Sequence, residues 1–233
     1  MRWRPSTGSL MADPVGNYLR ELDGNLSRWL TPVVKWLVYL CVGVALVMIF
    51  IPYEIIGLFG ARADTAIFHL WIWQFLTYAL VHGGFSHLLF NLLALWMFGT
   101  RLEMTWGSDR FLRFVIVVSA GAVATHMIVT LFTGQINVPI IGISGVVYGI
   151  LLVYAMYYPD EMVFFYFLIP IKVKYFVVIL GALAFLSSLG PQTGVAHMTH
   201  LGGLLFGYLF YKFPNIFDRL PVRWPGRSRR RNW

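Results

Sequence analysis

The residues whose types could carry out chemistry begin with Ser144, which lies between glycines in the segment Gly142-Ile143-Ser144-Gly145. The surrounding sequence is almost wholly apolar, and a lone serine in such a segment usually bonds back to its own helix. Here two other apolar segments also begin with polar side chains. One starts with His197 and His200, and the other contains the polar residues His82, His87 and Asn91. A serine, a histidine and amide donors are the groups that acyl transfer through a serine nucleophile requires.

The elements that must position these side chains are membrane helices. Hydrophobic residues make up 58% of the 233-residue chain and charged residues only 12%, whereas a soluble domain has about 25% charged residues. The mean hydropathy is +0.70. The composition therefore predicts an all-α polytopic membrane protein. The net charge of +8 comes from basic residues that flank apolar segments, which indicates topology and contact with membrane lipids rather than a nucleic-acid partner.

Six apolar runs are predicted to form six transmembrane helices, although several are shorter than the roughly 20 residues that span a bilayer. They cover residues 33–51, 85–102, 111–132, 141–158, 175–189 and 196–211. Residues 55–84 are rich in aromatic side chains and predict a membrane-embedded loop between helices 1 and 2. The expected organisation is an interfacial N-terminal segment at 1–31, a six-helix domain at 32–213 and a basic cytoplasmic tail at 214–233.

The distribution of arginine and lysine predicts the orientation. With six spans, seventeen of the eighteen basic residues lie on one side of the membrane, and only Arg62 lies on the other. The positive-inside rule then places both termini in the cytoplasm. The N-terminus lacks a short apolar segment with a cleavage site, so we expect no removable signal peptide. The compact layout favours a bacterial inner (plasma) membrane.

This topology brings the polar side chains to one depth. Predicted helices two, four and six all enter from the outer face, and His87, Asn91, Ser144 and His200 each lie within about two turns of an entry. At about 1.5 Å rise per residue, they lie at most about 10 Å below the outer boundary. We therefore expect a single polar site beneath the outer surface.

Glycines provide the means for two of these helices to approach each other. Gly145 and Gly149 form a pair at i, i+4 next to Ser144, and Gly203 and Gly207 form another on the face of His200. Such pairs let helix backbones pack closely. Packing through these faces would bring the serine hydroxyl within hydrogen-bonding reach of the imidazole, as a general base requires.

The remaining parts of an acyl-transfer site can also be assigned. Tyr148, one turn beyond Ser144, is expected to stack on the imidazole of His200. His87 and Asn91 are spaced i, i+4 and share a helix face, and the Ser144 N–H at a helix start is a free donor for an oxyanion. No Asp or Glu within the membrane is placed to orient the histidine, so the prediction is a Ser–His dyad without an acidic third member. We expect no metal and no other cofactor.

Three motifs in this order resemble the rhomboid family of intramembrane serine proteases. They are the Gly-x-Ser-Gly at 142–145, the His-x-Gly-Gly-x-x-x-Gly at 200–207, and the His-x4-His-x3-Asn formed by His82, His87 and Asn91. Each motif alone is weak, but together they are specific. The resemblance covers about residues 33–212, nearly all of the hydrophobic part of the chain.

The resemblance implies roles for individual residues. Ser144 would be the nucleophile, His200 the general base, and His87, Asn91 and the Ser144 amide the oxyanion hole, with Gly142 and Gly145 in support. It also implies that Phe90 gates the substrate side. The segment containing Phe98-Gly99, Glu103 and residues 107–110 resembles a structural part of the family, which we interpret as an ion pair or a helix-cap cluster.

Two histidines need a separate interpretation. His197 lies one turn before His200, and the match to the glycine pattern is the reason for assigning His200 as the base. His82 is interpreted as a structural hydrogen-bonding residue that steadies the loop.

Three functions follow as hypotheses. The leading one is an endopeptidase that cuts the transmembrane segments of other proteins through an acyl-enzyme intermediate. The second is a catalytically inactive relative that binds membrane clients, and the third is a metal transporter using the histidines. The third is disfavoured because the sequence has no carboxylates at the membrane midplane and no inverted repeat.

Overall fold

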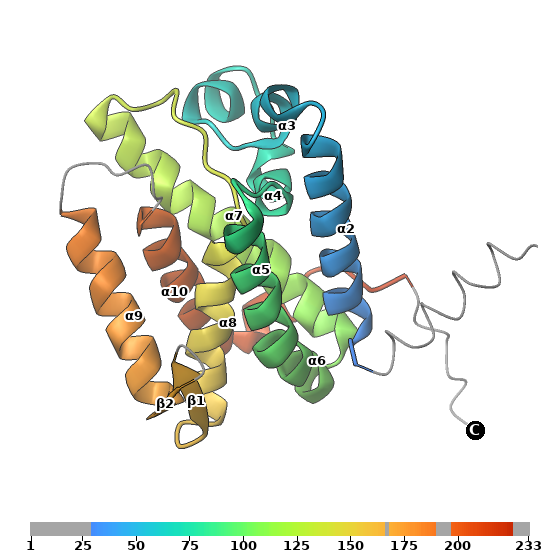
Figure 1. The fold of residues 1–233 in the computed structure, drawn as a ribbon, viewed down its shortest axis with the longest axis vertical. Helices are drawn as coiled ribbons and strands as arrows, with labels where there is room; N and C mark the ends of the chain where they lie inside the picture. Colours follow the sequence, from blue (N-terminus) through green and yellow to red (C-terminus); the bar gives the residue numbers. More distant parts are fainter. Residues whose placement is uncertain (1–28, 166–167, 190–196, 226–233) are drawn as a thin grey trace, which may run out of the picture.

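The computed structural model describes residues 29–165, 168–189 and 197–225 of the chain. Helices dominate these residues, and together they form one bundle (Figure 1). The predicted surface helix within residues 1–31 lies outside the described residues, except for its last three positions. The end of the basic tail, from residue 226 onward, also lies outside them.

In the described part of the chain, seven main helices match the six predicted apolar runs to within a few residues. They are α2 (Pro32–Met48), α5 (Phe85–Ala94), α6 (Thr100–Trp106), α7 (Ser108–Thr133), α8 (Ser144–Tyr157), α9 (Val173–Ser188) and α10 (His197–Lys212). A π-helical turn, η3 (Leu95–Gly99), joins α5 to α6, so that the pair corresponds to one predicted run. Helix α10 packs against α7, α8 and α9, and α8 lies in the middle of the bundle in Figure 1.

The number of membrane spans remains a prediction. Among the described residues, α7 is the one helix that is long and apolar enough to cross a bilayer by itself, with 26 residues. A second candidate joins residues 74–80 to residues 85–106 with a bend of 102° between the two parts. Helices α2, α8 and α9 are apolar but shorter.

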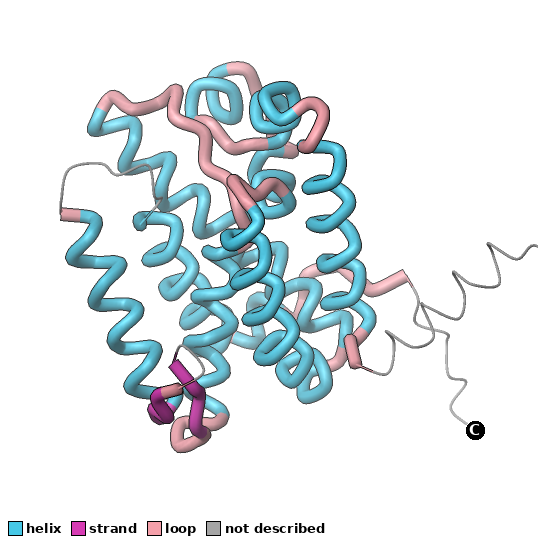
Figure 2. The backbone as a smooth tube through the Cα atoms, viewed as in Figure 1, coloured by secondary structure: helices cyan, strands magenta, loops and turns pink. Residues whose placement is uncertain are grey.

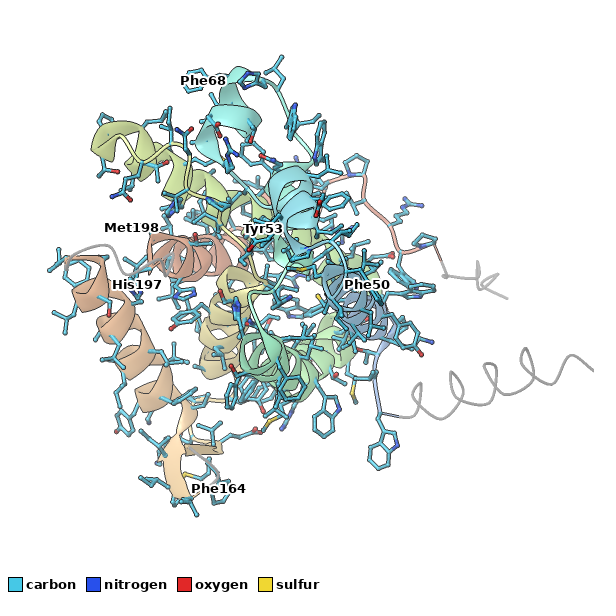
Figure 3. The ribbon with its side chains drawn as sticks, turned by 45° about the horizontal axis from the view of Figure 1, so that its top comes forward. Phe50, Tyr53, Phe68, Phe164, His197 and Met198 are labelled. Atoms are coloured by element: carbon cyan, nitrogen blue, oxygen red, sulfur yellow. The ribbon has the colours of Figure 1, made fainter. Side chains whose placement is uncertain are left out.

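The predicted loop at 55–84 contains several short helices. These are the end of α3 (Pro52–Phe59), η1 (Asp64–Phe68), α4 (Gln74–Thr77) and η2 (Tyr78–Leu80). The buried Tyr78 hydroxyl donates a 2.9 Å hydrogen bond to the Ser119 carbonyl of α7. This bond ties the C-terminal part of the region to the bundle. The middle of the region exposes large apolar side chains, including Phe68 (Figure 3).

A small β-hairpin corrects the prediction of an all-α chain. Strands β1 (Met162–Phe165) and β2 (Ile169–Lys172) pair antiparallel between α8 and α9, and Figure 2 shows them in magenta. Valine, phenylalanine and isoleucine favour extended backbone. Pro170 is compatible with β2 because both strands of a two-stranded sheet are edges.

Glu103 of α6 caps the N-terminus of α2. Its carboxylate accepts hydrogen bonds from the N–H groups of Val33 (2.9 Å) and Val34 (3.0 Å), and from the hydroxyls of Thr31 (2.5 Å) and Ser108 (2.6 Å). Glu103 is almost completely buried. Of the two interpretations offered for this segment, the structure therefore shows the helix cap.

Candidate active site

A glycine with an unusual backbone positions Ser144. Gly142 has φ of +107°, a region that side chains other than glycine rarely adopt. A Cβ atom at this position would also lie 2.7 Å from Cε1 of His87, so the His87 ring leaves no room for a side chain here. Two residues later Ser144 is the first residue of α8, and its N–H therefore has no carbonyl partner within that helix.

Close contact between α8 and α10 positions His200. A Cβ atom added to Gly149 would lie 2.9 Å from the carbonyl oxygen of Gly203, and one added to Gly207 would lie 2.8 Å from Cα of Gly149. A Cβ atom added to Gly203 would overlap the carbonyl oxygen of Gly145. The two glycine pairs therefore face each other and let the backbones touch.

This packing brings Ser144 and His200 into direct contact. The serine Oγ lies 2.8 Å from the imidazole Nε2, a hydrogen bond between the two helices. The ring of Tyr148 stacks on the imidazole with its centroid 4.3 Å away. Within the described residues, no acidic side chain bonds the imidazole. The geometry is that of a serine–histidine pair in which the hydroxyl can pass its proton to a neutral ring.

His197 lies near the pair without joining it. Its ring centroid is 6.3 Å from that of His200, and the two planes are inclined by 75°. Figure 3 places His197 at the start of α10, next to Met198. The described hydrogen bond of Ser144 goes to His200.

A cavity of about 630 Å³ opens onto the serine and brings together the residues singled out in the sequence. Its lining includes Ser144, His200, His87, Asn91, Phe90, Tyr148 and Gly142. The Asn91 side chain donates a 2.9 Å hydrogen bond to the His87 carbonyl one turn earlier. An amide NH₂ has two donors, so one N–H of Asn91 remains for a ligand.

The cavity also contains side chains that the sequence analysis did not single out. Val147 and Leu151 lie three and seven residues after Ser144, so helical periodicity could have placed them on the same face. Leu180 of α9 also lines the cavity. The sequence contains no signal for Leu180, because α9 is apolar on all sides.

His82 lies behind this lining. Its Nδ1 is 3.2 Å from the Leu80 carbonyl, and its ring meets the His87 ring edge-on with centroids 5.1 Å apart. Its Nε2 has no hydrogen-bond partner among the described residues. These contacts place His82 against the loop and against His87 rather than against Ser144.

No cluster suited to a metal ion occurs in the described part of the chain. A group of three or more His, Cys, Asp or Glu side chains in suitable positions is missing there.

Comparison with known proteins adds an independent observation. The family model described as "Rhomboid domain" matches residues 69–213, which include every residue named above in the site. The rhomboid protease GluP of Bacillus subtilis (strain 168) is 32% identical over 158 residues, which are 66% of this chain and 28% of that protein.

Two further relatives match a similar part of the chain. The putative rhomboid protease YdcA of B. subtilis (strain 168) is 33% identical over 137 residues, which are 59% of this chain and 64% of that protein. The rhomboid protease GlpG of Haemophilus influenzae (strain ATCC 51907 / DSM 11121 / KW20 / Rd) is 31% identical over 140 residues, which are 60% of this chain and 68% of that protein. The chain thus spans less than two thirds of the length of GluP and of YdcA.

Proposed function

The chain belongs to the rhomboid family and is an integral membrane protein, and on this premise we propose that it is an intramembrane serine endopeptidase. Its reaction is the hydrolysis of peptide bonds in or near the transmembrane segments of other membrane proteins. The observation that carries the proposal is the 2.8 Å hydrogen bond between Ser144 Oγ and His200 Nε2 at the wall of a cavity.

The proposed reaction has two steps. In the first, Nε2 of His200 takes the proton of Ser144 as Oγ attacks the scissile carbonyl carbon. The protonated imidazole then gives this proton to the leaving amine, and the acyl group stays on Oγ as an ester. In the second step, the imidazole takes a proton from water as the water oxygen attacks the ester carbonyl carbon. The protonated imidazole then returns this proton to Oγ as the bond between Oγ and the acyl carbon breaks, which restores Ser144 and releases the carboxylate product. Tyr148 holds the ring plane through both steps.

Three donors are proposed for the oxyanion. The first is the free N–H of Ser144 at the start of α8, and the second is the remaining N–H of Asn91. His87 supplies the third, because its Nδ1 accepts a 3.4 Å hydrogen bond from the Gly83 N–H. A neutral imidazole that accepts at Nδ1 carries its proton on Nε2 and can donate from there. Such donors stabilise negative charge that develops in the transition state.

The topology is part of the proposal. We assign six spans, with α5 to α6 counted as one, an embedded loop between the first and second spans, and both termini in the cytoplasm. Residues 32–213 form the protease domain, residues 1–31 precede it at the interface, and residues 214–233 form the tail. The excess of basic residues on one side supports this arrangement, with the site toward the outer face of a bacterial inner membrane.

The cavity favours apolar segments that lose helical structure near the cut. Its walls carry Val147, Leu151 and Leu180, and the half-exposed Phe90 lies on its lining, where a gate would act. An intact helix hides its peptide bonds in its own hydrogen bonds, so the bond to be cut must first be exposed. Transmembrane segments with small or helix-breaking residues near the cut are therefore the proposed substrates.

The second candidate is a relative that binds membrane clients without cutting them. Such a protein has no need for a serine hydroxyl bonded to an imidazole, and this chain has both. A fluorophosphonate probe distinguishes the two candidates because it labels only an activated serine.

The test uses the detergent-solubilised chain and the variants Ser144→Ala, His200→Ala and His197→Ala, each with and without a chelator. We expect labelling to be lost in the first two variants, kept in the third, and unaffected by the chelator. A folded wild type that fails to label would rule out the protease, and labelling lost on chelation would favour the metal hypothesis.

A further inference from the structure

We propose that the segment after α10 carries a binding site for the headgroups of anionic glycerophospholipids. This segment, residues 213–224, is named here the C-terminal strap; it includes the short helix α11 (Pro214–Phe217) and is the red segment that leads to the grey C-terminal trace in Figure 1. The site consists of cations on or beside the strap and exposed apolar side chains between them, namely Lys212, Arg219 and Arg223 with Phe213, Ile216 and Leu220.

The strap is fixed to the first turns of α7. Asp218 forms an ion pair with Arg110 at 3.2 Å and lies 3.9 Å from Arg113. Arg113 also donates a 3.1 Å hydrogen bond to the Val222 carbonyl. These bonds hold the middle of the strap against the end of the bundle.

Two further contacts hold the strap against the bundle. The ring of Phe217 stacks on the buried Phe210 of α10 with centroids 5.2 Å apart. The backbone N–H of Trp224 donates a 2.7 Å hydrogen bond to the Asp109 carboxylate. The strap therefore has a defined face toward the bundle and a defined face away from it.

The exposed positive charge on and beside the strap is not compensated by the strap itself. Asp218 is the one acidic residue between 213 and 225, and it is engaged by the two arginines of α7. Within the described residues, Lys212, Arg219 and Arg223 form no ion pair, and all three are exposed. By contrast, Lys172 and Lys174 at the β-hairpin both pair with Asp160.

The apolar side chains explain why the partner is a membrane lipid. Ile216 is 63% exposed and Phe213 is 46% exposed, beside the cations. Exposed apolar side chains next to lysine and arginine are typical of segments that lie in the interface of a bilayer. The apolar groups can contact acyl chains while the cations bind phosphate, and an anionic headgroup supplies the charge that the strap lacks.

The test counts lipids that remain bound to the full chain. The protein is reconstituted in nanodiscs of phosphatidylcholine with about one tenth phosphatidylglycerol, extracted into mild detergent, and analysed by native mass spectrometry. The double variant Arg219→Gln/Arg223→Gln is compared with Lys172→Gln/Lys174→Gln, which removes the same charge from residues that already have a partner. Slow labelling of the buried Cys41 by a maleimide verifies that each variant is folded.

We expect the wild type to retain phosphatidylglycerol in preference to phosphatidylcholine, and the preference to fall as salt rises. In the Arg219→Gln/Arg223→Gln variant, the apparent affinity for phosphatidylglycerol should fall about tenfold, while the hairpin variant stays close to wild type. An equal loss of phosphatidylglycerol affinity in both variants would show that net charge alone causes the binding, and would disprove the proposed site. Unchanged retention in the arginine variant, or a change in oligomeric state without any lipid preference, would overturn it as well.

Discussion

The imidazole of His200 lies flat against the phenol ring of Tyr148, with centroids 4.3 Å apart and planes inclined by only 3°. This stack fixes the plane in which Nε2 faces the serine. We predict that Tyr148→Phe, which keeps a ring, retains most of the probe labelling rate, whereas Tyr148→Ala lowers it about tenfold to a hundredfold because the base is no longer held in place. Labelling kinetics of the two variants, measured beside the wild type, decide between a positioning ring and a required hydroxyl.

The glycine contact between α8 and α10 gives a second prediction. Gly203→Ala would push a methyl group into the backbone of Gly145, so the two helices must separate. We expect a loss of about 1–3 kcal/mol in the free energy of unfolding and a strong decrease in probe labelling. Gly43→Ala in α2 is the control, because no heavy atom lies within 4 Å of its added Cβ. Equal labelling by the two variants would contradict this account.

The Glu103 cap leads to a prediction about stability. Glu103→Ala leaves the N–H groups of Val33 and Val34 without an acceptor in a buried position. We expect the free energy of unfolding to fall by about 3 kcal/mol, because an unsatisfied partner of a charged group is costly. The control is Glu54→Ala, which removes an exposed carboxylate from the first turn of α3 and should cost about 0.5 kcal/mol. Reversible unfolding in mixed micelles measures both, and a similar loss in the two variants would disprove the cap.

The carboxyl of Asp160 gives a prediction about pH. Hydrogen bonds from Lys174 and then Lys172 lower the pKa of this exposed group to about 2. A lowered carboxyl pKa stabilises the folded hairpin above the unfolded pKa of about 3.9, and the contribution is lost as the pH falls from about 4 toward 2. Carbon-13 NMR of the carboxyl should show the pKa rising toward about 3.9 in Lys174→Gln, and less so in Lys172→Gln. An unchanged titration in Lys174→Gln would contradict the assignment.

Much of the candidate site could be predicted because its signals are local. The position of Ser144 next to one glycine pair, and of His200 on the face of another, needs only helical spacing and a common depth in the bilayer. The contribution of α9 could not be predicted in this way. Leu180 belongs to a helix that is apolar all round, and such a helix has no stripe that shows which side faces the cavity.

The fold likewise has parts with a local sequence signal and parts without one. The apolar runs located the main helices, since length and hydropathy act within each segment. The β-hairpin was missed because four-residue strands are too short for periodicity to separate from a connection. The helix that Glu103 caps could not be named either, because Val33 and Val34 lie about seventy positions earlier in the chain.

That separation also bears on how the protein is made. Helix α2 is synthesised first of the described helices, yet the acceptor for its opening N–H groups is Glu103, 70 residues after Val33. At roughly 5–20 residues per second, the ribosome needs roughly 4–14 s to add that length. During this interval the start of α2 must bond to water or to lipid headgroups instead. Helix α2 is therefore completed by a residue of α6, and a nascent chain arrested before Glu103 should carry α2 without this cap.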